Sequence, residues 1–417
     1  MKKRIIFNIF SIIFLLTLVI FYGYRLFYYY MLEHKTYENK TVYLYEKLID
    51  NKGIIGTDKG LIAKDNTYIY TSKSDDNYLY FAGRMWRIIS IDQNNNIKMI
   101  TEEPQTLLTW NNDISFNDSD INIWLNKNDN ENSGIFELSL KENIQRLMRQ
   151  NNLVATLLTK EEYSLLNQNN YLVNTPFWIT DNDGSPLYVD SKGNINNDFE
   201  NSEFYGVRPV IILSNDWLYL SGTGAETDPY IIENNEVDLL SKAYVGEYIN
   251  YSGYKWRIID NDEEKTKISL DNSLDNTNIY SNYDNEYSIK EGIGLYLNSE
   301  FYNSLENNDY IVNSNYYTGT YTNNNEYSYL NTYSNNVEAL VGLYALGEFY
   351  INQVGNTYTL TPYLNTKKTI YTINDNNKIY ADFIDSVYNI RPVINIDSSL
   401  FIISGNGTSE SPYEIGR

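Results

Sequence analysis

The feature that most constrains the fold is an internal repeat. Residues 207–232, VRPVIILSNDWLYLSGTGAETDPYII, align without a gap with residues 390–415, IRPVINIDSSLFIISGNGTSESPYEI, and ten of these 26 positions are identical. Three further motifs recur in the same order: GRMWRII and GYKWRII, INIWLN and IGLYLN, and LVATLLTKEEY and LVGLYALGEFY, which begin at residues 83 and 253, 121 and 293, and 153 and 340. A tandem duplication of a module of about 160–180 residues explains this order.

We therefore expect two modules, residues 77–235 (the first module) and residues 240–417 (the second module), each with an α+β fold. Each begins with an aromatic and β-branched stretch typical of strands, YLYFAGRMWRIISID or YINYSGYKWRIIDND, and ends on another apolar stretch. Because the longest repeated motif closes each module, we expect its last strand to pair with the module's own first strand. Such modules would follow one another as independent beads.

Between these strands, the spacing of apolar residues predicts helices. We expect one at DINIWLN with Asp120 as N-cap and one at residues 138–150. A third is expected at TKEEYSLLNQ, where Thr159 and Glu162 have the spacing of a capping box. IKMIT, after the turn-forming DQNNN, predicts a second strand in the first module.

The closing motif contains glycines that invite comparison with a phosphate-binding loop. No Lys-Ser or Lys-Thr follows them, and no helical pattern begins there, so the phosphate loop is disfavoured. We expect turns with positive φ at Gly222, Gly224, Gly405 and Gly407.

The first thirty residues are expected to anchor the chain in a membrane. Residues 5–22 are eighteen mostly apolar residues without a charge, a length at the lower bound for a helix that spans a bilayer. Lys2, Lys3 and Arg4 precede them. The alternative is a cleaved signal peptide, but no small-residue cleavage site follows. We predict a single-pass bacterial membrane protein with a cytoplasmic N-terminus and an extracellular bulk. Residues 31–76 form a juxtamembrane spacer, with a helix near KTVYLYEKLID.

Charge and composition exclude several classes of protein. The net charge is −22 and the isoelectric point is near 4.5, whereas nucleic-acid binding requires a basic surface. With no cysteine and one histidine, the chain has no disulfide, cysteine nucleophile, cysteine-bound zinc or multi-histidine metal site. Its 54 acidic residues are too many for any pair of them to indicate a glycosidase from sequence alone.

Two stretches carry the residues that we assign as ligand-binding candidates. The second module has a Tyr- and Asn-rich insertion at residues 313–336, which is a composition suited to a loop or hairpin that stacks on sugars and bonds to their hydroxyl groups. An inert loop, enriched in Tyr and Asn by an AT-rich genome, is the alternative. The counterpart in the first module is FWITDNDGSPLYVD. The candidates are Trp178, Asp181, Asp183, Tyr188, Tyr316, Tyr317, Tyr321, Tyr327, Tyr329 and Tyr333.

The segment Asp-Asn-Asp-Gly at residues 181–184 resembles part of a calcium loop. The remaining ligands of an EF-hand are missing at their required spacing, so we favour a plain turn in which an aspartate side chain bonds to the backbone. We expect no cofactor, and calcium is the alternative that stays open.

Four repeat positions have a structural interpretation. Trp86 and Trp256 lie inside apolar strands, which favours the core over an exposed platform for sugars. Arg208 and Arg391 precede Pro209 and Pro392 at strand starts, which favours a buried ion pair over anion binding.

The ordered motifs resemble modules found in uncharacterised surface proteins of Firmicutes and mollicute-like gut bacteria, which look similar to the C-type-lectin and sulfatase-modifying-factor fold. Gly83, Trp86 and Arg87 match their opening strand, and Arg208 with Pro209 matches their closing strand, each with its repeat in the second half. The resemblance implies two tandem C-type-lectin-like modules behind the transmembrane helix. Sulfatase-modifying chemistry depends on cysteines, and this chain has none. The calcium-binding triplets of lectins, Glu-Pro-Asn and Gln-Pro-Asp, are also absent.

Together these observations predict a membrane-anchored extracellular binding protein rather than an enzyme. It would recognise a glycan or envelope polymer through Tyr- and Asn-rich loops, with avidity from two modules. A structural or assembly component that contacts other envelope proteins is the alternative, and a carbohydrate-active enzyme is a third reading. We expect no nucleic-acid partner.

Overall fold

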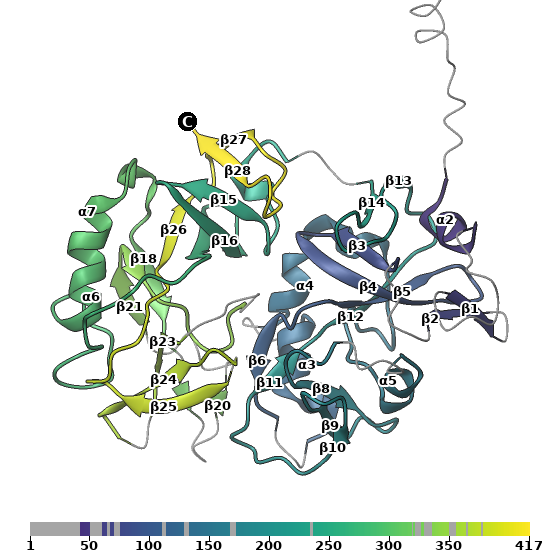
Figure 1. Cartoon of the computed structure of the whole chain (residues 1–417), viewed down its shortest axis with the longest axis horizontal. Coiled ribbons are helices and arrows are strands. Elements are labelled where there is room, and N and C mark those ends of the chain that lie inside the picture. Colours follow the sequence, from purple (N-terminus) through teal and green to yellow (C-terminus); the bar gives the residue numbers. More distant parts are fainter. Residues whose placement is uncertain are drawn as a thin grey trace, which may run out of the picture. The chain divides into compact units, whose positions relative to one another are not determined.

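A computed structural model gives a sheet-rich α+β fold with short helices, and Tyr43–Arg417 form one compact unit (Figure 1). It describes residues 42–50, 61–64, 67–70, 76–110, 114–128, 133–166, 172–233, 237–318, 320–321, 327–328, 336–349, 356–363, 366–376 and 378–417. The predicted anchor at residues 1–30 lies outside these ranges. Within them, every helix is too short or too polar to span a bilayer.

Two mixed sheets repeat one strand order. The first sheet runs β13 (Tyr219–Ser221), β14 (Tyr230–Ile232), β3 (Tyr78–Phe81), β4 (Arg84–Ile91), β5 (Ile97–Thr101), β12 (Val210–Leu213) and β7 (Leu147–Met148), with β1 (Leu61–Lys64) and β2 (Thr67–Tyr70) added beside β4. The second sheet runs β27 (Phe401–Ser404), β28 (Tyr413–Gly416), β15 (Tyr248–Tyr251), β16 (Tyr254–Asn261), β17 (Lys265–Leu270), β26 (Val393–Asp397) and β22 (Val341–Gly342). The first six strands of each order are repeat partners, so the sequence repeat is also a repeat of sheet topology. The seventh strands are not partners, because the counterpart of β22 is the segment at Thr156, which bridges to Val210.

The closing motif of each half pairs with its opening strand, as predicted. β14 lies parallel to β3, with Tyr230 opposite Leu79, and β28 lies parallel to β15, with Tyr413 opposite Ile249. The predicted positive φ angles are confirmed at all four glycines of the motif, which have φ of 93°, 85°, 91° and 76° at Gly222, Gly224, Gly405 and Gly407. A side chain at Gly222 would place its Cβ 1.9 Å from the carbonyl oxygen of Pro229, so the turn requires glycine.

Smaller sheets and short helices complete the fold. The remaining strands are β10 (Ile195–Asn196), β9 (Pro186–Val189), β8 (Phe177–Thr180), β11 (Tyr205–Val207) and β6 (Thr106–Leu108) in one sheet, β23 (Thr357–Pro362), β24 (Thr369–Ile373) and β25 (Ile379–Phe383) in another, and the pairs β18 (Ser314–Tyr317) with β21 (Asn336–Ala339) and β19 (Thr320–Tyr321) with β20 (Tyr327–Ser328). The helices are α2 (Leu44–Asp50), α3 (Asp120–Leu125), α4 (Ile135–Ser139), α5 (Lys160–Leu166), α6 (Gly292–Tyr296), the π-helical η4 (Leu297–Phe301) and α7 (Tyr302–Ser304), with 3-10 turns η1 (Phe116–Asp118), η2 (Lys141–Arg146), η3 (Leu240–Lys242) and η5 (Asn308–Tyr310).

The helix predictions succeed where a cap is encoded locally. The capping box before α5 is confirmed, because the amide of Glu162 donates to Thr159 Oγ1 over 3.2 Å and the amide of Thr159 donates to Glu162 Oε2 over 3.0 Å. The N-cap of α3 is Ser119 rather than Asp120, since the Ser119 hydroxyl accepts the amide of Asn122.

The predicted helix at residues 138–150 is wrong. Lys141 has a φ of 52°, which ends α4, and the chain continues as the 3-10 turn η2 and the edge strand β7. The Nζ atom of Lys141 donates to the carbonyl oxygens of Ser241 and Ala243 over 2.6 Å each. A contact with the second module therefore accompanies the left-handed backbone that interrupts the amphipathic pattern.

The segment predicted as a spacer contributes to the first sheet. The predicted helix near KTVYLYEKLID is confirmed as α2, whose Leu44 and Leu48 are buried. The amide of Leu44 donates to the carbonyl oxygen of Trp217 over 2.9 Å, and the amide of Leu240 donates to that of Leu400 over the same distance. The acceptor residues Trp217 and Leu400 are repeat partners, so Leu44 and Leu240 bond to equivalent positions of the two sheets.

An asparagine holds the two central segments of each half together. Asn126 Oδ1 accepts the amides of Val154 and Ala155 over 2.9 Å each. In the second half, Asn298 Oδ1 accepts the amides of Leu340 and Val341 over 3.0 Å each. The structural offset between these segments is thus 186 residues, one less than the offset of 187 that the printed motifs suggest.

The same offset of 186 relates the glutamates of two partly buried ion pairs. Lys98 pairs with Glu162 in the first module and Lys267 pairs with Glu348 in the second. The second oxygen of each glutamate accepts an amide three residues earlier, from Thr159 or from Ala345. Only the first of these turns continues into a helix, so the turn itself, and not the helix, is the repeated element.

The four repeat positions are buried, with equivalent contacts. The indole of Trp86 donates to the carbonyl oxygen of Phe81 and that of Trp256 to the carbonyl oxygen of Tyr251. Arg208 Nη1 donates to the carbonyl oxygen of Thr101 over 3.1 Å. Arg391 Nη1 makes the corresponding bond to Leu270 over 3.0 Å.

The predicted ion pair at Arg208 is wrong. Its guanidinium bonds to backbone carbonyl oxygens and to Asn174 Oδ1, over 2.6 Å, rather than to a carboxylate. The arginine thereby satisfies the carbonyl groups at the end of β5.

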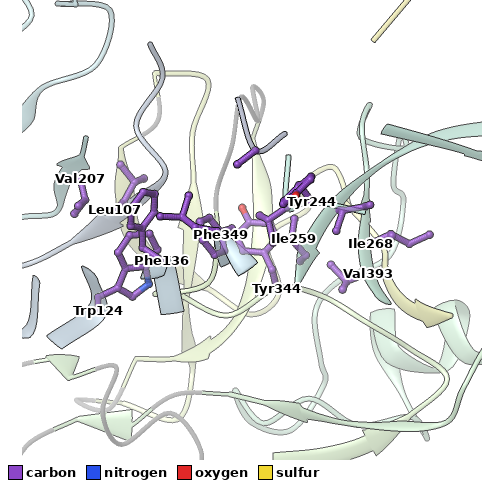
Figure 2. Packing of buried hydrophobic residues seen from close by; sticks show 14 of the residues in the cluster. Leu107, Trp124, Phe136, Val207, Tyr244, Ile259, Ile268, Tyr344, Phe349 and Val393 are labelled. Atoms are coloured by element: carbon purple, nitrogen blue, oxygen red, sulfur yellow. The ribbon is translucent and has the colours of Figure 1, made fainter. Parts of the chain in front are cut away.

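A continuous hydrophobic core joins the two halves, so the prediction of independent beads is wrong. Figure 2 shows Trp124 and Phe136 of the first module beside Phe349 and Tyr344 of the second. The Trp124 indole donates to the carbonyl oxygen of Gly347 over 2.9 Å, and its ring lies 5.1 Å from that of Phe349. Each module therefore completes the core of the other.

Two glycines let the backbones approach at this junction. Gly83 has a φ of 74°, and a Cβ built on it would lie 2.6 Å from the carbonyl oxygen of Val245. A Cβ on Gly246 would lie 2.4 Å from the carbonyl oxygen of Gly83. Gly253 is the repeat partner of Gly83 and has a φ of 75°, but nothing lies within 4 Å of its Cβ position.

Glu247 should make stability depend on pH. Burial raises its pKa to about 7 from an ordinary 4.5, against the opposing effect of the Tyr244 amide, which donates to Oε2 over 2.7 Å. The pKa of Glu247 is higher in the folded protein than in the unfolded chain, so the protonated side chain favours folding. Its contribution to the free energy of unfolding is fully present below pH about 4.5. As the pH rises through about 7 this contribution is lost, and the free energy of unfolding falls by about 3 kcal/mol.

Urea unfolding of the wild-type chain and of Glu247→Gln at several pH values between 5 and 8 measures this effect. We expect the stability of the variant to fall much less between pH 5 and 8, because glutamine does not ionise. The residue at the equivalent position of the first module, Asn77, already carries an amide. An equal decline in both proteins would contradict the assignment to Glu247.

Candidate functional site: an aromatic groove between the modules

A groove of about 700 Å³ runs between the five-stranded sheet β10-β9-β8-β11-β6 of the first module and the β24–β25 hairpin of the second. Phe204 of the first module packs edge-on against Tyr371 of β24, with ring centroids 6.0 Å apart, which fixes the two walls near this point. The groove thus depends on the docking of the modules. We call it the aromatic groove.

Its first wall is an aromatic cluster built on β8, β9 and β11. Tyr188 and Tyr205 stack with centroids 4.3 Å apart and an interplanar angle of 18°. Trp178 lies beneath them, fully buried, with its ring 4.8 Å from Tyr205 and its indole donating to the carbonyl oxygen of Leu108. Because Trp178 and Phe199 pack behind the pair, the two tyrosine rings are held rigidly at the groove.

Its second wall is the turn of the β24–β25 hairpin. Asn374 Oδ1 accepts the amides of Asn376 and Lys378, which shapes the turn, and Asp375 accepts the amide of Asn356. Tyr380 follows on β25 with 48 % of its surface exposed. The groove therefore has tyrosines on both walls.

The polar groups of the groove fall into two sets. Asp190 accepts bonds from its own turn, and Asn174 bonds to Arg208 and Glu103, so both are already engaged. The side chains of Ser191, Ser202, Asn376 and Lys378 line the groove and make no hydrogen bond or ion pair to another residue that the structure describes. These four can bond to a ligand without breaking existing contacts.

Burial affects the two stacked tyrosines directly. The pKa of Tyr188 and of Tyr205 is raised above the ordinary value of 10.0, primarily because burial disfavours the phenolate. Both phenols therefore stay protonated at physiological pH and can donate as well as accept hydrogen bonds.

The predicted site residues of the first module separate into two places. Tyr188 lines the aromatic groove and Trp178 supports it, whereas Asp181 and Asp183 line a different cavity of about 470 Å³, which also contains the Lys98–Glu162 ion pair. Asp183 Oδ1 accepts the amide of Ser185 over 2.9 Å, which is the plain turn that we favoured. Among the described residues, no three acidic or histidine side chains converge as metal ligands.

The tyrosine-rich insertion of the second module is a hairpin at its base, formed by β18 with β21 and by β19 with β20. Tyr316 lies in the core, where its hydroxyl bonds to the carbonyl oxygens of Leu340 and Val393, and Tyr317 is half-buried. Tyr321 and Tyr327 are backbone register partners in the β19–β20 pair. Tyr329 and Tyr333 lie outside the described residues.

Sequence analysis misses Tyr205, Asn376, Lys378 and Tyr380. A weak signal for Tyr380 exists, because the mixed polar and apolar residues of KIYADF suit a strand with a solvent-facing side. Nothing in the sequence indicates that this strand lies opposite Tyr188, about 190 positions away, because the docking of the modules creates the groove.

Comparisons with protein-family models, curated proteins and solved structures found no match for this chain.

Proposed function

We propose that the protein binds a neutral or amino-sugar glycan in the aromatic groove. The observation that carries this proposal is the rigid Tyr188–Tyr205 pair facing the same groove as the exposed Tyr380. Sugar rings present apolar C–H faces that pack on aromatic rings, and their hydroxyl groups bond to serine and asparagine side chains. The groove offers both kinds of contact in about 700 Å³, a volume within the usual range for small-molecule sites.

This proposal changes the recognition mode that the sequence predicts. Instead of two separate loop sites acting by avidity, one groove uses residues of both modules. The C-type-lectin-like fold, the membrane anchor and the extracellular, cell-surface location belong to the same proposal. Their support remains the ordered motifs and the charge-free apolar stretch at residues 5–22.

Replacement of Tyr380 tests the proposed function. We expect Tyr380→Ala to weaken binding of the full-length chain to its best ligand on an array of neutral and amino-sugar oligosaccharides about tenfold, since a lost ring contact is worth about 1.4 kcal/mol. Tyr380 is half exposed, so the fold should tolerate the change.

Tyr283→Ala is the matched control, because Tyr283 is 75 % exposed and does not line the groove. Equal binding by Tyr380→Ala and the control would refute the groove as the site. An array without any glycan signal would refute glycan binding altogether.

A second candidate function is assembly with other envelope proteins. β27 is the edge strand of the second sheet and exposes Phe401 by 57 % and Ile403 by 69 %. Exposed apolar residues at a sheet edge favour contact with another protein. Co-purification of a defined partner that is lost with Ile403→Lys, together with an empty glycan array, would favour this function.

A further inference from the structure

A second opening lies at the junction of the modules, with a volume of about 780 Å³. Both copies of the closing motif line it: Glu226, Thr227 and Asp228 from the first copy, and Thr408, Ser409 and Glu410 from the second. We call this opening the junction cleft. None of its residues belongs to the aromatic groove.

Two buried arginines line the inner part of the junction cleft. Arg84 is 2 % exposed and Arg257 is 9 % exposed. The Arg84 guanidinium donates to the carbonyl oxygen of Ala82 and to Ser139 Oγ, over 3.1 and 2.6 Å, and lies 5.1 Å from the Phe349 ring centre. All of these partners are uncharged. Within the described part of the chain, no carboxylate oxygen lies within the 4.0 Å of Arg84 that defines an ion pair.

The two arginines act on each other through their charges. Burial lowers the pKa of Arg84 to about 9, and the positive charge of Arg257 is the next cause. Glu247 offsets this only in part, because its own pKa is raised to about 7. An anion bound in the cleft that both arginines line would offset their repulsion, and a carboxylate would supply the planar acceptor that arginine favours.

The rim narrows the choice of anion. Glu226, Asp228 and Glu410 are exposed carboxylates around the entrance, and they would repel a doubly charged phosphate more strongly than a single carboxylate. The same carboxylates, with the hydroxyl groups of Thr227 and Thr408, accept hydrogen bonds from ligand hydroxyl groups. The cleft therefore combines two buried arginines and one half-buried carboxylate, Glu103, with an acidic, hydroxyl-bearing rim, which suits a monoanion that carries several hydroxyl groups.

We propose that the junction cleft binds a small sugar acid, with its carboxylate against Arg84 and Arg257 and its hydroxyl groups against the rim of the two closing motifs. The site requires both modules and is independent of the aromatic groove. It also gives the repeated motif a role beyond closing each sheet, because both copies face one ligand.

Isothermal titration of the full-length chain with glucuronate tests this site, with glucose and glucose 6-phosphate as comparison ligands. We expect glucuronate to bind at least tenfold more tightly than either. Arg84→Gln should weaken glucuronate binding about ten- to hundredfold, the range for loss of a charged hydrogen-bonding partner. Tyr283→Ala, at a residue that does not line the cleft, should bind glucuronate like the wild-type chain.

Because Arg84 is buried, a variant on the exposed rim provides a second measurement that does not depend on the stability of Arg84→Gln. Glu410→Gln removes one repelling charge and should tighten glucuronate binding about twofold at low salt. Absence of binding by glucuronate, equal binding of glucose, or stronger binding of glucose 6-phosphate would each overturn the proposal. Unchanged glucuronate affinity in both Arg84→Gln and Glu410→Gln would overturn it as well.

Discussion

We expect Trp124→Ala to lower the free energy of unfolding by about 3–5 kcal/mol, the usual cost of removing a fully buried tryptophan. Its indole contacts Phe136 within the first module and Phe349 of the second, and it donates to the carbonyl oxygen of Gly347. The variant therefore loses packing on both sides of the junction and leaves a buried carbonyl oxygen without its donor. Urea unfolding followed by tryptophan fluorescence measures the change.

The repeat supplies a matched control for this variant. Tyr296 occupies the same motif position in the second module but is only partly buried. We expect Tyr296→Ala to cost about 1 kcal/mol. If both variants lost the same stability, Trp124 would contribute only to the first module, and the continuous core would not couple the two halves.

Gly83→Ala, compared with its repeat partner, distinguishes the stability that comes from docking of the modules from the cost of placing alanine in a turn with positive φ. An alanine at this position carries the cost of positive φ, about 1–2 kcal/mol, and its Cβ would meet the backbone of Val245. Relief of that clash requires the two modules to move apart, which we expect to cost a further 1–3 kcal/mol, in the range of overpacked cores.

Gly253→Ala has the same backbone strain without the clash, because its φ is 75° and no atom lies within 4 Å of the Cβ position. We expect this control to cost about 1–2 kcal/mol. The difference between the two variants, measured by urea unfolding, reports the docking of the modules. Equal losses would mean that the close approach of Gly83 and Gly246 does not contribute to stability.

The elements predicted correctly from the sequence are those fixed by local chemistry. The capping box at Thr159 and Glu162, the turns at the four repeated glycines and the strand IKMIT each depend on neighbouring residues. The pairing of each closing strand with its opening strand could be predicted from the duplication, because both stretches recur in the same order at the two ends of each module.

The failures arise where contacts from distant residues override local preference. The helical spacing at residues 138–150 is real, but Lys141 bonds across the junction to Ser241 and Ala243 and adopts a left-handed backbone. Tyr316 belongs to a stretch whose composition suits a surface loop, yet its ring is fully buried beneath Gly342. Neither contact leaves a periodic signal in the sequence.

The candidate site shows the same division. Tyr188 can be selected from its segment, because an aromatic strand beside a turn is a common ligand-binding arrangement. Tyr380 and Lys378 cannot, since they reach the groove only through module docking. Asp181 and Asp183 are close to Tyr188 in sequence, but they lie in the β8–β9 turn and line another cavity.

The parallel pairing of β28 with β15 has a consequence for how the polypeptide folds as it is made. The first sheet has all its closing residues once position 232 has been synthesised, whereas the second must wait until position 416. At ribosomal speeds of about 5–20 residues per second, that interval lasts about 10–40 seconds. At its start, Trp124 of the first half has been synthesised but its partners Gly347 and Phe349 have not, so the core at the junction stays incomplete until the later half is made.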